Sequence, residues 1–165
     1  MAHRIRLRKP WQRRDHLVGG ECDPDHLGSE GANTVAADRV DVPDPQPEES
    51  GGQPTDRARV DRVSYVRQFH RPSGLERHDR VILEIGAVAG RISRLSINNL
   101  KISGFNDQAV DDQGLPSEGQ AGLRVDLTDQ LVDHNELEIH LVAASDPAGP
   151  PRLVGEVNLW IIEAG

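Results

Sequence analysis

Strict alternation of apolar and polar side chains constrains the fold of this chain more than any other feature. In residues 80–86, RVILEIG, the side chains of Val81, Leu83 and Ile85 fall on one side. Residues 136–143, ELEIHLVA, repeat the pattern with leucine and isoleucine. Successive side chains of a strand point to opposite faces, so a period of two is typical of a strand with one buried face. These segments predict β-strands rather than helices.

Other parts of the chain carry the same pattern. Residues 63–69, 92–97, 123–127 and 153–162 also place apolar side chains at alternate positions. Turn-forming residues separate the segments at intervals of roughly 8–12 residues, which is typical of sandwiches and barrels. We therefore predict an all-β fold, an antiparallel β-sandwich of about eight strands, with no long helix.

The N-terminal third differs in composition from the rest. Residues 3–9 alternate arginines with Ile5 and Leu7, which indicates an edge strand with its arginines in solvent. Residues 43–54, PDPQPEESGGQP, contain too little apolar surface to offset the entropy of ordering them. We predict that residues 1–11 hold the first strand, that 12–60 form a disordered insertion or linker, and that 61–165 form the sandwich domain.

Charge and targeting signals restrict the partners. The formal net charge of -8 disfavours nucleic acid, whose phosphates require clustered cations, although the basic N-terminus leaves a nucleic-acid arm as a less favoured alternative. The single cysteine, Cys22, excludes an internal disulfide. No apolar stretch has the length of a membrane span or of a signal-peptide core. We expect a cytoplasmic protein that binds neither nucleic acid nor membrane.

Asn98 and Asn99 separate two short apolar segments. Asparagine tolerates positive φ better than most residues, and the two-residue hairpin turns require positive φ. The pair therefore predicts a tight hairpin. The favoured interpretation of both side chains is a turn-forming one, in which they bond local backbone groups.

The order of the motifs resembles a known domain. The segments SYVRQFHRP, RVILEIGAVAGRISRLSINN, LRVDLTDQL and HNELEIHL follow one another between residues 63 and 143. In order and spacing they resemble the sugar-binding jelly-roll domain of family 2 glycoside hydrolases, a member of the galactose-binding-like superfamily. The hairpin departs from the family pattern, which has Asn-Gly, and the aromatic content is only 3%. In those enzymes the catalytic carboxylates lie in a separate (β/α)₈ domain, so the resemblance implies a binding fold without hydrolysis.

The resemblance and the predicted loops indicate where a ligand would bind. In some members of the family, loops near the hairpin help to line the sugar pocket. The candidate surface consists of the loops after Phe69, after Asn98 and after Phe105. The candidate ligand-binding residues are Asn98, Asn99, Asn106, Asp107 and His70.

Metal and cofactor sites are not expected. Asn106, Asp107, Asp111 and Asp112 offer oxygen ligands that suit a structural calcium ion, but a solvated acidic loop is the favoured interpretation. The densest cluster of potential metal ligands comprises His16, Cys22, Asp23, Asp25 and His26, and its spacing matches no zinc pattern. His70 and His78 could meet across a hairpin, but two ligands do not close a site.

No catalytic motif is present. The sequence has no G-x-S-x-G elbow, P-loop or G-x-G-x-x-G fingerprint. Asp126 and Asp129 are interpreted as part of a capped turn rather than an acid–base pair, and Trp11 and Trp160 as core-edge side chains rather than sugar platforms. The leading hypothesis is a non-catalytic module that binds a carbohydrate or a protein through its loops. The alternative is a structural or protein-assembly sandwich with no small-molecule ligand, and a metal-dependent enzyme is the least favoured.

Overall fold

The computed structural model describes residues 2–17, 37–44, 60–103, 123–144 and 150–163. These residues contain twelve strands, one short 3₁₀ helix and no α-helix. The predicted all-β fold is therefore confirmed. The predicted number of strands was too low, because four strands have only two or three residues. Strands of that length are too short for an alternating pattern to mark them in the sequence.

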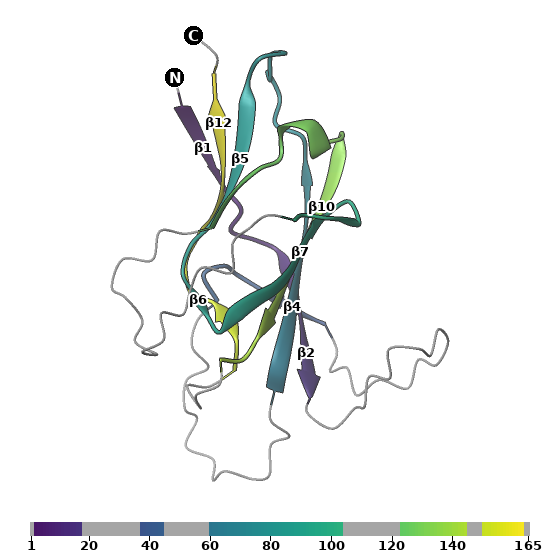
Figure 1. The fold of residues 1–165 in the computed structure, drawn as a ribbon, viewed down its shortest axis with the longest axis vertical. Helices are drawn as coiled ribbons and strands as arrows, with labels where there is room; N and C mark the ends of the chain where they lie inside the picture. The colour runs from purple at the N-terminus through teal and green to yellow at the C-terminus, as the bar shows by residue number, and fades with distance from the viewer. Residues whose placement is uncertain (1, 18–36, 45–59, 104–122, 145–149, 164–165) are drawn as a thin grey trace.

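One layer of the sandwich is a four-stranded antiparallel sheet (Figure 1). Its strands, in spatial order, are β1 (Ala2–Arg6), β12 (Val157–Ile162), β5 (Arg80–Ile85) and β9 (Leu123–Asp126). The first and last strands of the chain are direct partners, with Ala2 opposite Ile162. The two ends of the described chain therefore lie side by side, as Figure 1 shows.

The second layer is a six-stranded antiparallel sheet. Its strands, in spatial order, are β3 (Asp38–Val40), β2 (Trp11–Leu17), β4 (Val60–His70), β10 (His134–Val142), β7 (Arg91–Ile97) and β8 (Leu100–Lys101). A separate pair is formed by β6 (Val88–Ala89) and β11 (Arg152–Leu153), and the 3₁₀ helix η1 (Thr128–Gln130) follows β9. The three longest strand pairings in this sheet join β2 to β4, β4 to β10 and β10 to β7.

The core lies between the two sheets, and the alternating residues fill it as predicted. Leu83 of β5 and Leu95, Leu137 and Ile139 of the facing sheet are fully buried. The ring of Trp11 also has no exposed surface, and it packs edge-on against Tyr65 with the ring centroids 6.5 Å apart. Each such side chain contributes about 1.5–3 kcal/mol through burial. The prediction that Trp11 belongs to the core is confirmed.

The prediction for residues 12–60 is wrong wherever the structure describes them. β2 continues to Leu17 within the six-stranded sheet, and β3 pairs with it. Val42 and Asp44 are buried as well. The polar composition misled the prediction because this part of the chain is held by charge pairs as well as by apolar contacts. Residues 18–36 and 45–59 lie outside the described residues.

Arg13, Asp15 and Asp44 form the charge pairs that hold this segment. Arg13 bonds Asp15 through Nε at 2.7 Å and Asp44 through Nη1 at 2.7 Å. The hydroxyl of Tyr65 donates to the same oxygen of Asp44, and the Asp44 amide donates to the carbonyl of Leu153 at 2.8 Å. Burial lowers the pKa of Arg13, but its bond to Asp15 and the nearby charges outweigh burial and raise it. A buried charge is tolerated only with such partners.

The first strand agrees with its prediction only in part. β1 is an edge strand, and Arg4 and Arg6 are exposed, as expected. However, Ile5 is 39% exposed, so this strand does not have a buried face, and Leu7, just beyond it, is the residue that is buried. An edge strand has a neighbour on one side only, so its side chains are covered less than those of β12 or β5.

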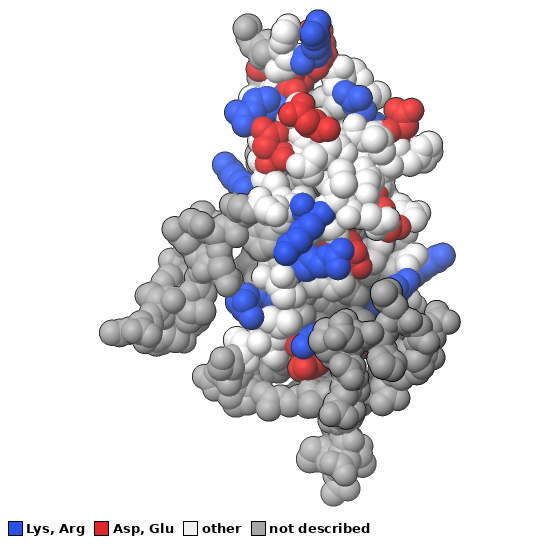
Figure 2. All heavy atoms as spheres, turned by 45° about the vertical axis from the view of Figure 1, so that its right-hand side comes forward, with Lys and Arg blue, Asp and Glu red and all other residues white. Residues whose placement is uncertain are grey.

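The surface carries both signs of charge. On the face drawn in Figure 2, basic and acidic side chains lie next to one another rather than in a field of one sign. On the outer side of the four-stranded sheet, Arg124 pairs with Glu84 and Arg80 with Asp126, each at 2.6 Å. In the described part of the chain, no helix has the length and apolarity needed to cross a membrane.

Candidate functional site

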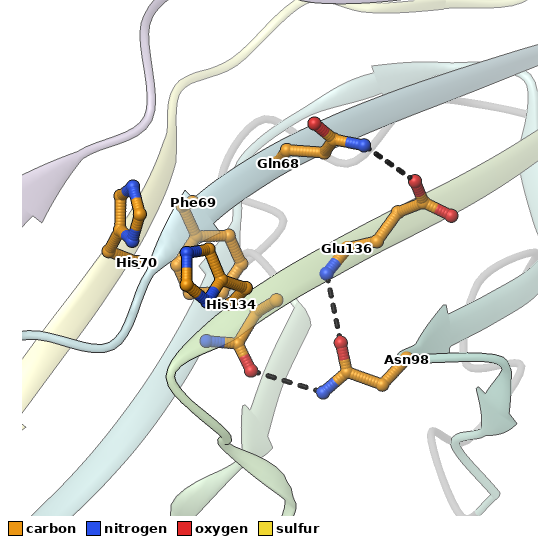
Figure 3. Close-up of a pocket in the computed structure, with 7 residues that line it drawn as sticks. Gln68, Phe69, His70, Asn98, His134 and Glu136 are labelled. Atoms are coloured by element: carbon orange, nitrogen blue, oxygen red, sulfur yellow. Dashed lines mark hydrogen bonds between the residues drawn. The ribbon is translucent and has the colours of Figure 1, made fainter.

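A cavity of about 330 Å³ opens where β4 ends, β10 begins and β7 turns into β8 (Figure 3). The residues that line it are Gln68, Phe69, His70, Asn98, His134, Asn135 and Glu136. Three neighbouring strands of the six-stranded sheet therefore contribute to one site, although the residues lie in three separate parts of the sequence.

The hairpin between β7 and β8 forms one wall of the cavity. Ile97 pairs with Leu100, so the turn has two residues, Asn98 and Asn99. Their φ angles are 51° and 64°. Two successive positive values are the signature of the mirror-image turn that matches the twist of paired strands. The predicted asparagine hairpin is confirmed.

Asn98 fixes the wall through its side chain as well as through its backbone. Its Nδ2 donates to the carbonyl of Gln130 at 3.2 Å and to Oδ1 of Asn135 at 3.1 Å. Its Oδ1 accepts the amide N–H of Glu136 at 2.9 Å. One side chain thus joins the hairpin, the end of η1 and the start of β10. The turn-forming role of Asn98 is confirmed, but its side chain bonds groups distant in the sequence rather than the local backbone groups that were predicted, and it also lines the cavity.

Asn135 closes the loop that leads into β10. It is 3% exposed, its Oδ1 accepts the amide N–H of Val132 at 2.9 Å, and its Nδ2 donates to the Val132 carbonyl at 2.7 Å. These bonds satisfy a buried amide whose burial without partners would cost about 1–3 kcal/mol. Asn135 therefore holds the start of β10, where the chain lines the cavity.

Four polar side chains stand in two opposed pairs on β4 and β10. The register places His134 opposite His70 and Glu136 opposite Gln68. Gln68 Nε2 donates to Glu136 Oε2 at 3.1 Å, and the two imidazole rings meet with centroids 4.6 Å apart. Because residues two apart on a strand share a face, all four point the same way. Figure 3 shows the His70 and His134 rings beside one another.

The predicted site residues divide into three groups. Asn98 and His70 both line the cavity, so the structure brings them together. Asn99 is exposed and is not among the lining residues, because its turn position carries it away from the cavity. Asn106 and Asp107 lie outside the described residues, as do the calcium loop and the loop after Phe105.

Sequence reasoning missed His134, Asn135, Glu136 and Gln68. His134 and Asn135 begin the segment HNELEIHL that the sequence singled out, but the side chains that face each other depend on the register between β4 and β10. The expected approach of His70 to His78 is wrong for the described residues, in which the ring that contacts His70 is that of His134. β4 and β5 belong to different sheets, so no hairpin places His78 opposite His70.

Asp126, at the end of β9, has the turn-holding role that was predicted, although η1 itself has no side-chain cap. Asp126 Oδ1 accepts the amide N–H of Thr128 at 3.0 Å, and Thr128 Oγ1 accepts the amide N–H of Val81 at 2.9 Å. Burial raises the pKa of Asp126, but its bonds from Thr128 and Arg80 outweigh burial and lower it. The Asp126 carboxylate therefore holds this turn.

Comparison with known proteins identifies the fold and nothing more specific. No protein-family model matches the chain, and no curated protein matches it. Among solved structures, an FMN-binding β-glucuronidase from Faecalibacterium prausnitzii is 22% identical with a TM-score of 0.62. The chain has the fold of a jelly-roll domain found in glycosidases. A β-glycosidase from Bacteroides vulgatus (16%, TM-score 0.57) and a further F. prausnitzii β-glucuronidase (15%, TM-score 0.56) match the jelly-roll domain as well.

The jelly-roll domain corresponds to a small part of each of these proteins. The matches cover 96–98% of this chain, but only 20–31% of the glycosidase chains. At this identity the likeness shows the fold alone. The lining side chains have to be interpreted from their own chemistry: they offer amide, imidazole and carboxylate groups, and none of them is a hydroxyl or thiol nucleophile.

Proposed function

We propose that this chain is a non-catalytic module that binds a carbohydrate in the cavity between β4, β10 and the Asn98 turn. The cavity of about 330 Å³ falls within the roughly 300–1,000 Å³ of small-molecule sites. The fold, shared with domains of glycosidase chains, supports the proposal. The observation that carries it is the set of opposed polar pairs, His70 with His134 and Gln68 with Glu136.

These groups match the surface of a sugar. Hydroxyl groups both donate and accept, so a site for them needs donors and acceptors close together. Glu136 supplies carboxylate oxygens, held in place by Gln68, and the imidazoles supply either role. Phe69 also lines the cavity, but its side chain lies on the other face of β4, where it packs against the core. The exposure of Gln68, His70 and Glu136 leaves them accessible to a ligand.

The experiment is a titration of the purified chain with a panel of mono- and oligosaccharides, followed by calorimetry on any that bind. Glu136→Ala should weaken binding about tenfold or more, because a hydrogen bond to a charged group contributes about 1.5–3 kcal/mol. His78→Ala is the matched control, since His78 is exposed and lies outside the cavity. Absence of binding across the panel, or equal affinity of Glu136→Ala and wild type, contradicts the proposal.

A second candidate function is protein assembly, and a specific observation favours it. Leu100, which directly follows the Asn98 turn, is 59% exposed, and Val132, whose amide N–H bonds the Asn135 side chain that Asn98 also contacts, is 54% exposed. Large apolar side chains at such exposure are common at contact surfaces when they occur together. A Leu100→Ser, Val132→Ser double variant separates the two functions. Self-association lost in this variant supports assembly, whereas sugar binding that survives in it supports the carbohydrate site.

A further inference from the structure

His70 and His134, which the proposed carbohydrate site uses as hydrogen-bonding groups, also have a geometry that suits a second kind of ligand. They are direct partners across antiparallel strands, His70 at the end of β4 and His134 at the start of β10. Side chains at opposed positions leave the sheet on the same face, with Cβ atoms about 4.5–5.5 Å apart. The ring centroids are 4.6 Å apart with an interplanar angle of 63°. The two imidazoles are therefore close but not stacked (Figure 3).

This separation suits two ligands of one metal ion. An imidazole nitrogen binds a metal at about 2.0–2.1 Å, which places the ring centre about 3.1 Å from the ion. Two such rings, at ligand angles between a right angle and a tetrahedral angle, have centres about 4.4–5.1 Å apart. The observed 4.6 Å lies inside that interval. Chelation would then require ring rotation but no shift of β4 against β10.

The two rings are also free to accept an ion. In the described ranges, His3 bonds Glu163, His16 bonds Ser64 and His140 pairs with Glu138. Neither His70 nor His134 has a hydrogen-bond or ion-pair partner within these ranges, and both are exposed. Both rings are thus accessible to a metal ion from solvent.

We propose that His70 and His134 chelate a divalent transition-metal ion of the class that favours imidazole, such as Cu²⁺, Ni²⁺ or Zn²⁺. No group of three His, Cys, Asp or Glu side chains around one point occurs in the described residues, so the protein supplies two ligands. The remaining positions are open toward the cavity, where water or an oxygen donor of a bound molecule completes the coordination. The site exists whether or not a sugar binds, so the two proposals fail independently.

The test is a Cu²⁺ titration of the untagged full chain, followed by electron paramagnetic resonance and calorimetry without any sugar. Wild type should bind one ion more than the His70→Ala, His134→Ala double variant, and the spectrum of the additional ion should show superhyperfine structure from two nitrogens. His70→Ala and His134→Ala should each weaken this site tenfold or more, because the second ligand of a chelate acts at high effective concentration. The double variant should add little to either single change. His78→Ala, which removes an exposed histidine elsewhere, should leave the site unchanged.

Other histidines and Cys22 set a background, which the double variant measures directly. Both rings are exposed, so the variants are expected to fold, and equal melting temperatures without metal verify this. A metal-dependent rise in melting temperature, present in wild type and absent in the double variant, supports a link between β4 and β10. Wild-type binding no tighter than that of the double variant, or a spectrum with one nitrogen only, overturns the proposal.

Discussion

The indole N–H of Trp160 donates a 2.7 Å hydrogen bond to Glu84 Oε2 across neighbouring strands β12 and β5. The other carboxylate oxygen accepts from Arg124 at 2.6 Å, and the Arg4 guanidinium lies 5.6 Å from the centre of the indole ring. Trp160 is therefore not the core-edge residue that the sequence predicted: it is half-buried on the outer side of the four-stranded sheet, where it orients a carboxylate.

The pH dependence of stability should reveal this bond. The bond from Trp160 is the main cause that lowers the pKa of Glu84; burial opposes it, and Arg124 reinforces it. A lowered folded-state pKa means that ionised Glu84 stabilises the fold above its unfolded value of about 4.3, and that this stability is lost as pH falls through the folded value. Trp160→Phe should cost about 1–2 kcal/mol at about pH 7 and less at about pH 2.5, as measured by urea unfolding.

Two further variants separate the causes of that loss. Glu84→Gln should remove most of the pH dependence of the Trp160 effect, because its charge no longer titrates. Arg4→Ala should remove the contact of the guanidinium with the ring, about 0.5–1 kcal/mol at an exposed site, together with a long, exposed ion pair to Glu156. An equal cost of Trp160→Phe at both pH values would assign the effect to packing instead.

Asp44→Asn should destabilise the fold strongly. Asp44 is 6% exposed and accepts bonds from Arg13 and Tyr65, so the change leaves Arg13 with Asp15 as its charged partner. We expect a cost of about 2–3 kcal/mol, below the roughly 3–5 kcal/mol of a buried charge left with no partner. Asp41→Asn, which removes an exposed pair with Lys9, should cost less than about 1 kcal/mol. Equal costs in chemical denaturation would mean that the buried pair contributes nothing specific.

Asn98→Gly and Asn99→Gly should differ sharply although both glycines suit the turn. At Asn98 the change removes the side-chain bonds to Gln130, Asn135 and Glu136, and we expect a loss of about 1–3 kcal/mol. At Asn99 the change to glycine should alter the free energy of unfolding by no more than about 0.5 kcal/mol, since glycine is favoured at such positions. Urea midpoints of the two variants test this directly. Similar midpoints would show that the Asn98 bonds are dispensable.

Gly155→Ala should prevent stable folding. A Cβ at this position would lie 2.3 Å from the backbone nitrogen of Ala87 and 2.8 Å from atoms of Gly86. Backbone atoms cannot turn aside, so we expect a cost of about 3 kcal/mol or more. Gly74→Ala is the matched control: its φ is +79° with open space around it, and the strain should be about 1–2 kcal/mol. Circular dichroism melts distinguish the two, and a Gly155→Ala variant that melts like Gly74→Ala would refute the close approach.

Local patterns sufficed for the long strands and failed where partners are distant in sequence. Val81, Leu83 and Ile85 were placed in the core correctly because alternation within one strand decides which face is apolar. The burial of Asp44 was not predicted, because it depends on Arg13 and Tyr65, which lie on other strands. A segment that looks too polar to order is ordered when its charges meet partners that its own sequence does not show.

The candidate site could likewise be predicted only where a local sequence pattern marks it. Asn98 could be identified because a two-residue turn has a signature in sequence. The cavity itself depends on which residue of β4 stands opposite which residue of β10, and a shift by one position would place Glu136 opposite a different side chain. His70 was therefore selected for the loop that follows it, whereas its actual neighbour is His134.

The pairing of β1 with β12 has a consequence for how this domain is made. A ribosome adds Ala2 long before Ile162, yet the two residues are opposite one another in the sheet. The first strand synthesised therefore remains unpaired while nearly all the rest of the domain is translated. Its exposed arginine side chains suit this unpaired state, because charges on an edge strand disfavour pairing with a wrong strand.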